Sequence, residues 1–295
     1  MEIQEKISEY LKALEAQRTA KNTIEAYRRD LSRMADALME EHILAIDNVQ
    51  ELTLQSYIRQ MEQSGRRPAT VARAVASIKA FFRYLEKTGA FPQNPALQLK
   101  APHIEKEIPH VLTPEETVRL LKQPDGNSVK CIRDRAMLEL LYATGIRVSE
   151  LIQLRVEDVN LPMEYLLCSQ SRRERVIPFG RSARRALEEY LEHARPSMVR
   201  DASQQLLFTN LSGQQMSRQG FWKLVRQYAK AAGIQGEITP HTLRHSFAAH
   251  LVNNGADLYA VQEMMGFADL SAAQAYAKMH RVSVREEYTK AHPRE

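Results

Sequence analysis

Residues 239–247 read Thr-Pro-His-Thr-Leu-Arg-His-Ser-Phe and lie at the start of a helical segment that we expect over His241–Asn253. Residues three apart lie on the same side of a helix, so His241 and Arg244 share one face. Taken alone, a His-x-x-Arg pair is a weak signal, because short motifs of this kind also occur by chance. Its meaning depends on which other reactive side chains accompany it along the chain.

Two further side chains accompany the pair in a fixed order. Arg147 lies upstream, directly after Gly145-Ile146, where a predicted helix ends and a side chain can reach out of the fold. Tyr276 lies downstream, shortly after Asp269-Leu270-Ser271. By itself Arg147 is best interpreted as a surface residue and Tyr276 as a buried residue on a helix face. The evidence for a functional site comes from the four residues taken together and in this order along the chain.

The first hundred residues have the pattern of a compact helical bundle. In Asn22–Glu40 the apolar residues recur at spacings of three and four, the period of one helix face. Asn22 followed by Glu25 predicts a capping box at the start of this helix. Further helices are expected at Ile3–Leu14, near Leu54–Met61 and over Thr70–Lys87, the last with Val71, Val75, Ile78, Phe82 and Leu85 facing inward.

The helical pattern stops at residues 92–110, where prolines alternate with charged residues. Such a composition is typical of an exposed linker between domains. We therefore expect an N-terminal domain over residues 1–91, a linker over residues 92–110 and a second domain over residues 111–295.

The second domain is predicted to be mostly helical with one small antiparallel sheet. At Thr113–Glu116 a hydroxyl cap, a proline and a glutamate mark the start of a helix. Two short β-prone runs, Tyr165–Cys168 and Arg175–Pro178, are separated by a polar stretch and predict a hairpin. Further helices are expected at residues 133–143, 182–194, 218–232, 258–265 and 271–279.

Charge and composition exclude several classes of protein. The 295 residues include 41 Lys and Arg against 36 Asp and Glu, and the resulting charge of +5 permits nucleic-acid binding without requiring it. Cys131 and Cys168 lack any metal-ligand spacing, so neither a metal site nor a disulfide framework is expected. No apolar stretch reaches the roughly 18 residues of a membrane span, and residues 1–6 lack the core of a signal peptide. We expect a cytoplasmic protein that does not enter a membrane.

Taken together, these motifs resemble those of the tyrosine recombinase, or phage integrase, family, and most closely its XerC/XerD-like branch. The resemblance covers nearly the whole chain, since residues 22–31 are similar to the DNA-gripping N-terminal domain and residues 254–262 match the segment before the family's tyrosine. It implies a mainly α protein with an all-helical, SAM-like core-binding domain. The mostly helical catalytic domain carries a small antiparallel sheet.

The resemblance also implies a site-specific recombinase that cleaves and rejoins duplex DNA through a 3′-phosphotyrosine. Tyr276 is then the nucleophile that attacks the phosphodiester and leaves a free 5′-hydroxyl. Arg147 and Arg244 hold the phosphate, because guanidiniums suit two-pronged contacts with its oxygens. His241 is the general acid or base, because an imidazole has a pKa near about 6.5. The reaction needs no cofactor.

Two positions depart from the family pattern. In the predicted hairpin, Gln170 replaces a lysine that protonates the departing 5′-oxygen, and an amide has no proton to transfer. Arg172 and Arg173 lie close by in sequence, but a guanidinium is a poor acid. Phe267 replaces a histidine or tryptophan and lacks the ring N–H that would hold the phosphate. Each loss is expected to slow cleavage by roughly 10²–10⁴-fold. Both together are expected either to silence the enzyme or to make cleavage dependent on a partner subunit, and the alternative is that local repacking compensates for them.

Basic side chains of both domains are expected to form a clamp around duplex DNA, with most contacts to phosphates. For any one of them a solvated surface role is the simpler interpretation. The expected contacts are Arg28, Arg29, Arg66, Arg67, Arg73, Lys79, Arg83, Arg172, Arg173 and Arg218. In this family the C-terminal segment docks on a neighbouring subunit, so the resemblance implies a tetramer, with itself or a related recombinase, on two DNA sites.

Three hypotheses remain at this stage. An active recombinase explains the retention of the tyrosine, both arginines and the histidine. A DNA-binding, synapsis-forming relative with decayed cleavage explains Gln170 and Phe267. A helical scaffold without DNA function leaves the ordered set unexplained. For a recombinase, both chromosome-dimer resolution, which serves chromosome partition at cell division, and the movement of a mobile element are open.

Overall fold

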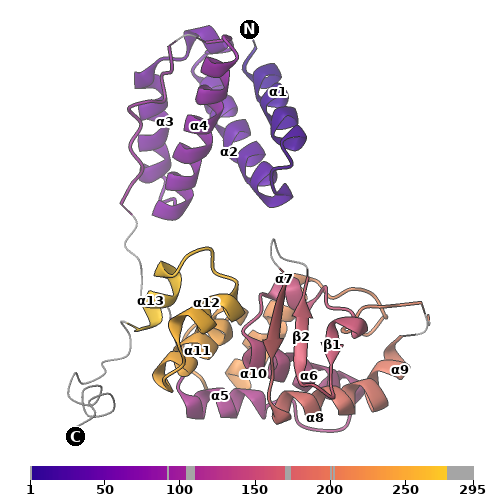
Figure 1. Ribbon diagram of the computed structural model, residues 1–295. Helices are drawn as coiled ribbons and strands as arrows, with labels where there is room; N and C mark the ends of the chain where they lie inside the picture. The colour runs from indigo at the N-terminus through magenta and orange to yellow at the C-terminus, as the bar shows by residue number, and fades with distance from the viewer. Residues whose placement is uncertain are drawn as a thin grey trace, which may run out of the picture. The chain divides into compact units, whose positions relative to one another are not determined.

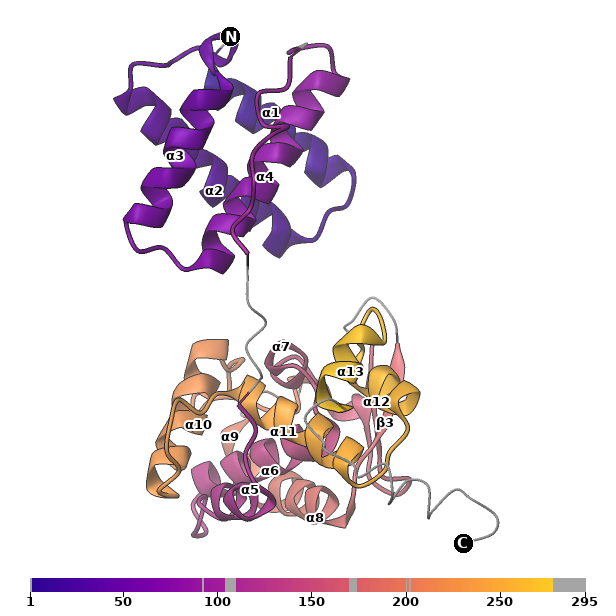
Figure 2. The ribbon, with the colours of Figure 1, turned by 90° about the vertical axis from the view of Figure 1, so that its left-hand side faces the viewer.

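The computed structural model describes residues 2–91, 93–103, 110–169, 174–199, 201 and 203–277. The chain divides into two compact units, Met1–Glu107 and Ile108–Glu295. In Figures 1 and 2 the first unit is indigo to purple, and the second runs from magenta to yellow. Within the described ranges, no helix combines the length and the apolar character that crossing a bilayer requires.

The N-terminal unit is a bundle of helices around one apolar core (Figure 1). Its elements are α1 (Ile3–Ala16), α2 (Lys21–Glu40), a 3₁₀ turn at Ile46–Asn48, α3 (Glu51–Gln63) and α4 (Pro68–Lys87). The helical spacing of apolar residues directs a stripe of each helix inward. In α4 the five residues predicted to face the core are buried, which confirms the pattern.

The start of α2 differs from the prediction. Its N-cap is Ala20, which makes no side-chain hydrogen bond. Asn22 already lies inside the helix, whereas a capping side chain has to precede the first helical residue. The predicted capping box of Asn22 and Glu25 is therefore wrong.

The core of the N-terminal unit extends past the end of α4. Phe91, Ala96 and Leu99 are buried in it, and the Ala96 amide donates to Asn94 Oδ1 at 3.0 Å. Ala96 and Leu99 fall in the segment 92–110, predicted as an exposed linker. Proline ends a helix without forcing the chain into solvent, so the beginning of this segment packs on the bundle.

The second unit contains a small antiparallel sheet with strand order β1-β2-β3. The strands are β1 (Val159–Asn160), β2 (Tyr165–Cys168) and β3 (Arg175–Pro178). The β2–β3 hairpin was predicted, and its register places Leu166 opposite Ile177 and Cys168 opposite Arg175. Strand β1 was not predicted, because two residues carry no detectable periodicity.

Helices make up most of the second unit. They are α5 (Pro114–Leu121), α6 (Val129–Thr144), α7 (Val148–Leu151), α8 (Arg181–Glu189), α9 (Arg195–Met198), α10 (Arg218–Ala231), α11 (Pro240–Asn253), α12 (Leu258–Met265) and α13 (Ser271–Ala277). A 3₁₀ turn lies at Val156–Asp158 and a π-helical turn at Tyr190–Ala194. The capping box at Thr113 and Glu116 is confirmed. The mainly α fold with a small antiparallel sheet is likewise confirmed.

Helix α6 is the central element of this unit. It packs against α5, α8 and α11 (Figure 2), and it is buried around most of its circumference, including Met137, Leu138 and Leu141. The buried face of α6 also includes Arg133 and Asp134, which form an ion pair at 2.6 Å. The C-terminal end of α6 is therefore held at a fixed place beside α11, and α12 lies beside β3.

Candidate active site

Two glycines that end helices bring the site together. Gly145 ends α6 and Gly266 ends α12, both in the left-handed region, with φ of 59° and 60°. A Cβ at Gly145 would overlap the ring of Phe247 on α11, and a Cβ at Gly266 would lie 2.6 Å from Nη1 of Arg175. Glycine is thus required for both the backbone angle and the close approach.

Arg244 lies buried between these helix ends. Its guanidinium donates to the carbonyls of Gly145 and Met265, at the C-termini of α6 and α12. Burial, followed by the charge of Arg147, lowers the pKa of Arg244 to about 10, so the side chain stays charged at neutral pH. These carbonyl contacts fix the direction of a positive donor before any substrate arrives.

Arg147 is fixed in a similar way but is more open to solvent. Its Nη2 donates to the Gly266 carbonyl at 3.0 Å, and its Nη1 donates to Glu150 Oε1 at 3.1 Å. Its backbone amide donates to Glu150 Oε2 at 2.7 Å. The side chain keeps 39% of its surface exposed, against 5% for Glu150. Arg147 therefore combines a fixed position with access for a ligand.

A buried ion pair between Glu150 and Arg175 holds the carboxylate that positions Arg147. Glu150 Oε2 accepts from Arg175 Nη2 at 2.8 Å, and Arg175 Nε donates to the Met264 carbonyl at 3.1 Å. Burial opposes ionisation of Glu150, but the Arg147 amide and Arg175 more than compensate and lower its pKa. Arg175 thus connects β3 to α12 and to the carboxylate that holds Arg147.

Neither Glu150 nor Arg175 was predicted as a site residue. A signal for Arg175 was present, because strand side chains alternate between two faces. In β3, Arg175 and Ile177 face inward while Val176 and Pro178 are exposed. A charged residue at an inward position of a strand requires a buried partner, and the carboxylate of Glu150 is that partner.

Tyr276, on α13, is present at the site but withdrawn from solvent. Only 3% of the residue is exposed, and its hydroxyl lies 2.5 Å from His245 Nδ1. Burial raises the pKa of Tyr276, with an opposing effect from Arg244. The phenol is therefore protonated and hydrogen-bonded in this arrangement.

Phe267 occupies the position between Arg244 and Tyr276. Its ring stacks on that of Tyr276 at a centroid distance of 6.2 Å and an interplanar angle of 15°. Arg244 Cζ lies 5.5 Å from the centre of the Phe267 ring, a cation–π distance. The phenyl ring thus contacts both neighbours, but it offers no hydrogen-bond donor.

Two histidines on α11 lie beside the tyrosine. The rings of His241 and His245 are 6.4 Å apart. Burial, then Arg244 and Arg147, lowers the pKa of His241, although this residue lies largely at the surface. Burial, then His241 and Arg244, lowers the pKa of His245. Both imidazoles are thus neutral at pH 7 and able to accept a proton.

His245 is a further site residue that the sequence interpretation missed. The sequence analysis named only His241 as a general acid or base, whereas the Tyr276 hydroxyl contacts His245. The spacing of four between His241 and His245 places both on one face of α11, so the sequence contained a signal for this residue.

The basic residues predicted to bind DNA are mostly exposed. Arg28, Arg29, Arg66, Arg67, Arg83 and Arg218 are exposed, and Lys79 is half-buried. Arg73 is exposed as well, with 42% of its side-chain surface accessible, but its Nε and Nη2 each donate to the buried carboxylate of Asp30 at 2.9 Å. The Asp30 pair gives this guanidinium a structural role, and its contact with DNA stays a prediction. Gln170, Arg172 and Arg173 lie outside the described residues.

Comparison with known proteins places the chain in a family. Residues 110–281 match the phage integrase family, and residues 7–89 match its N-terminal SAM-like domain. Over 290 residues the chain is 41% identical to the tyrosine recombinase XerD of Staphylococcus epidermidis, with 98% of each chain covered. The chain belongs to the Xer-type tyrosine recombinases of the phage integrase family. The resemblance drawn from its motifs is confirmed.

Solved structures of other recombinases share the fold. The XerA recombinase is 25% identical to this recombinase, with a TM-score of 0.55 and full coverage of both chains. The XerH recombinase, solved bound to a palindromic difH substrate after cleavage, is 21% identical with a TM-score of 0.74. That match covers 94% of this recombinase and 81% of XerH.

Proposed function

We propose that this recombinase cleaves and rejoins duplex DNA at specific sites through a 3′-phosphotyrosine formed on Tyr276. The observation that carries the proposal is the convergence of both arginines on the end of α12. Arg147 donates to the Gly266 carbonyl, Arg244 donates to the preceding Met265 carbonyl, and Tyr276 packs beside them on Phe267. XerH, whose fold is shared, was solved with its DNA substrate.

The two arginines supply the positive charge that phosphoryl transfer needs. As the Tyr276 oxygen bonds to phosphorus and the bond to the 5′-oxygen breaks, negative charge increases on the other phosphate oxygens. Arg147 and Arg244 are held by carbonyls and, for Arg147, by Glu150, so they need no reorientation during the reaction. Attack by another 5′-hydroxyl on the phosphotyrosine reverses these bond changes and rejoins the DNA.

The tyrosine has to leave its resting place before it attacks. Its hydroxyl is buried and contacts His245, whereas a DNA phosphate can reach it only from the solvent-exposed side of the site. We propose that binding of DNA draws α13 away from Phe267 and presents Tyr276 beside Arg147. A neutral histidine, His241 or His245, then accepts the phenolic proton.

We further propose that departure of the 5′-oxygen limits the rate of cleavage. The 5′-oxygen has to gain a proton as its bond to phosphorus breaks, and Gln170 has none to give. Phe267 contributes no donor to the phosphate, although its ring packs well. The nucleophile and the charged part of the site remain in place.

A second function is favoured by Phe267 and Gln170, which lack the donors that cleavage uses. The resting contacts of Tyr276 with Phe267 and His245 are compatible with both functions. A DNA-binding, synapsis-forming recombinase without cleavage would have the same two contacts and would never open them. The formation of covalent product separates the two functions.

The test uses DNA that the recombinase itself selects. Sequences recovered with the protein from cells provide duplexes carrying its site, and a nick beside the cleavage point traps the covalent intermediate. We expect a detergent-stable protein–DNA complex that Tyr276→Phe abolishes. Tyr259→Phe is the matched control, because Tyr259 is an exposed tyrosine of the same unit. Covalent product from the Tyr276→Phe protein would contradict the assignment.

We also propose that four subunits assemble on two DNA sites, as the family resemblance implies. The segment after Ala277, which carries the predicted docking contact, lies outside the described residues. Deleting it is expected to abolish assembly on two sites and to preserve binding to one. Unchanged assembly by the shortened protein, measured by mass in solution, would contradict the proposal.

A further inference from the structure

A surface cavity lies in the N-terminal unit, which does not contain the active-site residues. Its volume is about 260 Å³, and its lining residues are Arg33, Tyr57, Gln60, Met61, Ser64 and Arg66. Pockets for drug-sized ligands usually measure roughly 300–1,000 Å³. This cavity, which we call the arginine pocket, is therefore suited to a smaller group.

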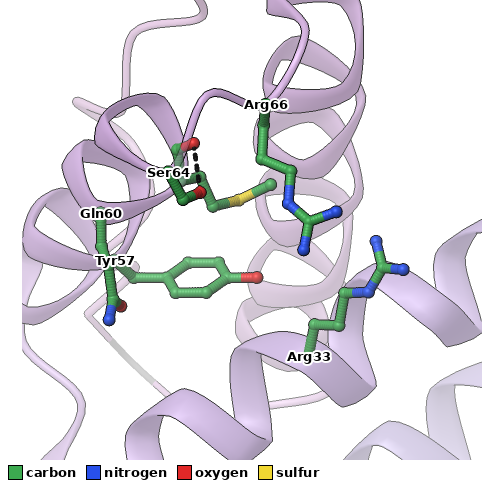
Figure 3. Close-up of a pocket in the computed structure, with 6 residues that line it drawn as sticks. Arg33, Tyr57, Gln60, Ser64 and Arg66 are labelled. Atoms are coloured by element: carbon green, nitrogen blue, oxygen red, sulfur yellow. Dashed lines mark hydrogen bonds between the residues drawn. The ribbon is translucent and has the colours of Figure 1, made fainter.

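Three side chains of the arginine pocket converge on one point. Arg33 comes from α2, Tyr57 from α3, and Arg66 from the turn before α4. Figure 3 shows the two guanidiniums pointing toward one another, with the Tyr57 hydroxyl directed between them. Ser64, which donates to the Met61 carbonyl at 2.8 Å, lies at the edge. The donors thus come from three elements that one folded core fixes.

The two guanidiniums of the arginine pocket have no paired carboxylate in the described part of the chain, although the charge of Asp36 also acts on Tyr57. Neither Arg33 nor Arg66 forms an ion pair with any described acidic residue. The nearby carboxylate of Asp30 is occupied by Arg73 at 2.9 Å. Two facing guanidiniums repel one another, and a bound anion relieves that repulsion.

Tyr57 adds a neutral donor between the two charges. Burial and then the charge of Asp30 raise the pKa of Tyr57, while Arg33 and Arg66 act in the opposite direction. The net effect keeps the phenol protonated at neutral pH. Its hydroxyl is therefore able to donate to an oxygen placed between the guanidiniums.

We propose that the arginine pocket binds one backbone phosphate of duplex DNA, gripped between Arg33 and Arg66 with Tyr57 as a third donor. This inference rests on the proposed DNA function and adds Arg33 and Tyr57 to the predicted contacts. Guanidiniums bind phosphate through paired N–H donors. A phosphate contact positions the protein on the duplex and carries no base information. The arginine pocket thus anchors the N-terminal unit without selecting a sequence.

The test measures the affinity of the full chain for duplex DNA as a function of salt. Neutralising one phosphate contributes about −0.9 to the slope of log affinity against log salt. We expect Arg33→Ala and Arg66→Ala each to weaken binding roughly tenfold at low salt. The double variant should lose less than the product of the two factors and shift the slope by about 0.9 in total, because both arginines serve one phosphate.

Two further variants sharpen the comparison. Tyr57→Phe keeps the buried ring and should weaken binding a few-fold with no change of slope, since the hydroxyl carries no charge. Arg59→Ala is the matched control, because Arg59 is an exposed arginine on α3 outside the arginine pocket. It should bind like the natural protein. Thermal unfolding of each variant checks that the bundle is intact.

The outcomes separate this inference from the proposed function. If the natural protein fails to bind duplex DNA, the proposed function itself is wrong. If it binds and the arginine-pocket variants match Arg59→Ala, the inference is overturned while the proposed function stands. Inorganic phosphate at constant ionic strength should inhibit DNA binding by the natural protein more than by the double variant, because it competes with the backbone phosphate for the arginine pocket. Equal inhibition of the two proteins would show that the arginine pocket does not hold a phosphate of the bound DNA and would overturn the inference.

Discussion

Replacing Glu150 by glutamine should damage both stability and catalysis through one buried carboxylate. In the natural protein its two oxygens accept three hydrogen bonds, two from Arg147 and one from Arg175. Glutamine has the same shape but offers one carbonyl oxygen and an NH₂ group. At best the carbonyl oxygen of the glutamine keeps two of the three hydrogen bonds. The NH₂ group then faces the guanidinium of Arg147, and because both groups are donors no hydrogen bond forms between them.

The magnitude follows from the burial of the pair. Side-chain exposure is 4% for Arg175 and 5% for Glu150, so the substitution leaves a positive charge inside the protein without its counter-charge. Removing one partner of such a pair costs roughly 3–5 kcal/mol. Because the amide retains two bonds, we expect a loss near the lower limit, about 3 kcal/mol. Loss of a fixed Arg147 should slow cleavage by roughly 10²–10³-fold.

Urea unfolding, followed through the transition of the catalytic unit, measures the loss of stability. For a slope of about 2 kcal/mol per molar, the midpoint should fall by roughly 1.5 M. The matched control is Glu188→Gln, because Glu188 pairs with Arg184 at 2.8 Å on the surface. Exposed pairs contribute at most about 1 kcal/mol. If the urea midpoint of Glu150→Gln falls no further below that of the natural protein than the midpoint of Glu188→Gln does, the reasoning is refuted.

Three further predictions concern the same site. His245→Ala should leave the buried phenol unpaired and speed hydrogen exchange of the α13 amides, whereas His245→Gln, which keeps an acceptor, should exchange more like the natural protein. The cleavage rate should rise with pH through a midpoint below 6.5 and level off, because the pKa of His241 is lowered and the neutral imidazole accepts the proton; a midpoint above 6.5 would contradict this. Gly266→Ala should destabilise the protein, by denaturant unfolding, more than Gly255→Ala, because both positions have positive φ but only Gly266 touches Arg175.

Much of the fold could be predicted from the sequence because its signals are local. Helical spacing predicted α1, α3 and α4, and the threonine–proline–glutamate start predicted α5. Where the local signal was ambiguous, the prediction failed. Asn22 and Glu25 have capping spacing, but the start of α2 at Lys21 places Asn22 inside the helix. The burial of Leu99 depends on tertiary packing, which proline content does not report.

The site was predicted only in part, for the same physical reason. The common location of Arg147, Arg244 and Tyr276 was predicted from the resemblance of their ordered set, together with His241, to the motifs of the recombinase family. The support of Arg147 by Glu150 depends on the inward face of a strand in the hairpin, which brings Arg175 to α7 from outside the motif. Contacts of this kind arise only when separate segments pack together.

The hydrogen-bond partner of Tyr276 in this structure could not be predicted from the sequence either. Whether Tyr276 meets His241 or His245 depends on how α13 packs on α11, and both histidines lie on the same helix face. In the structure the Tyr276 hydroxyl meets His245, and the ring of Phe267 stacks on Tyr276 and lies against Arg244. The sequence identified Phe267 as a lost donor, and the structure adds its contacts with both neighbours.

The most direct test of the account compares ordinary DNA with DNA carrying sulfur at the 5′-bridging position of the cleaved phosphate. Sulfur leaves without a proton, so it bypasses a missing general acid. For the natural protein we predict slow cleavage of ordinary DNA and a rescue of roughly 10²-fold or more by sulfur. Gln170→Lys should speed cleavage of ordinary DNA only, and adding Phe267→His should increase it further. Fast cleavage of ordinary DNA by the natural protein, or no covalent complex even with the sulfur substrate, would contradict the account.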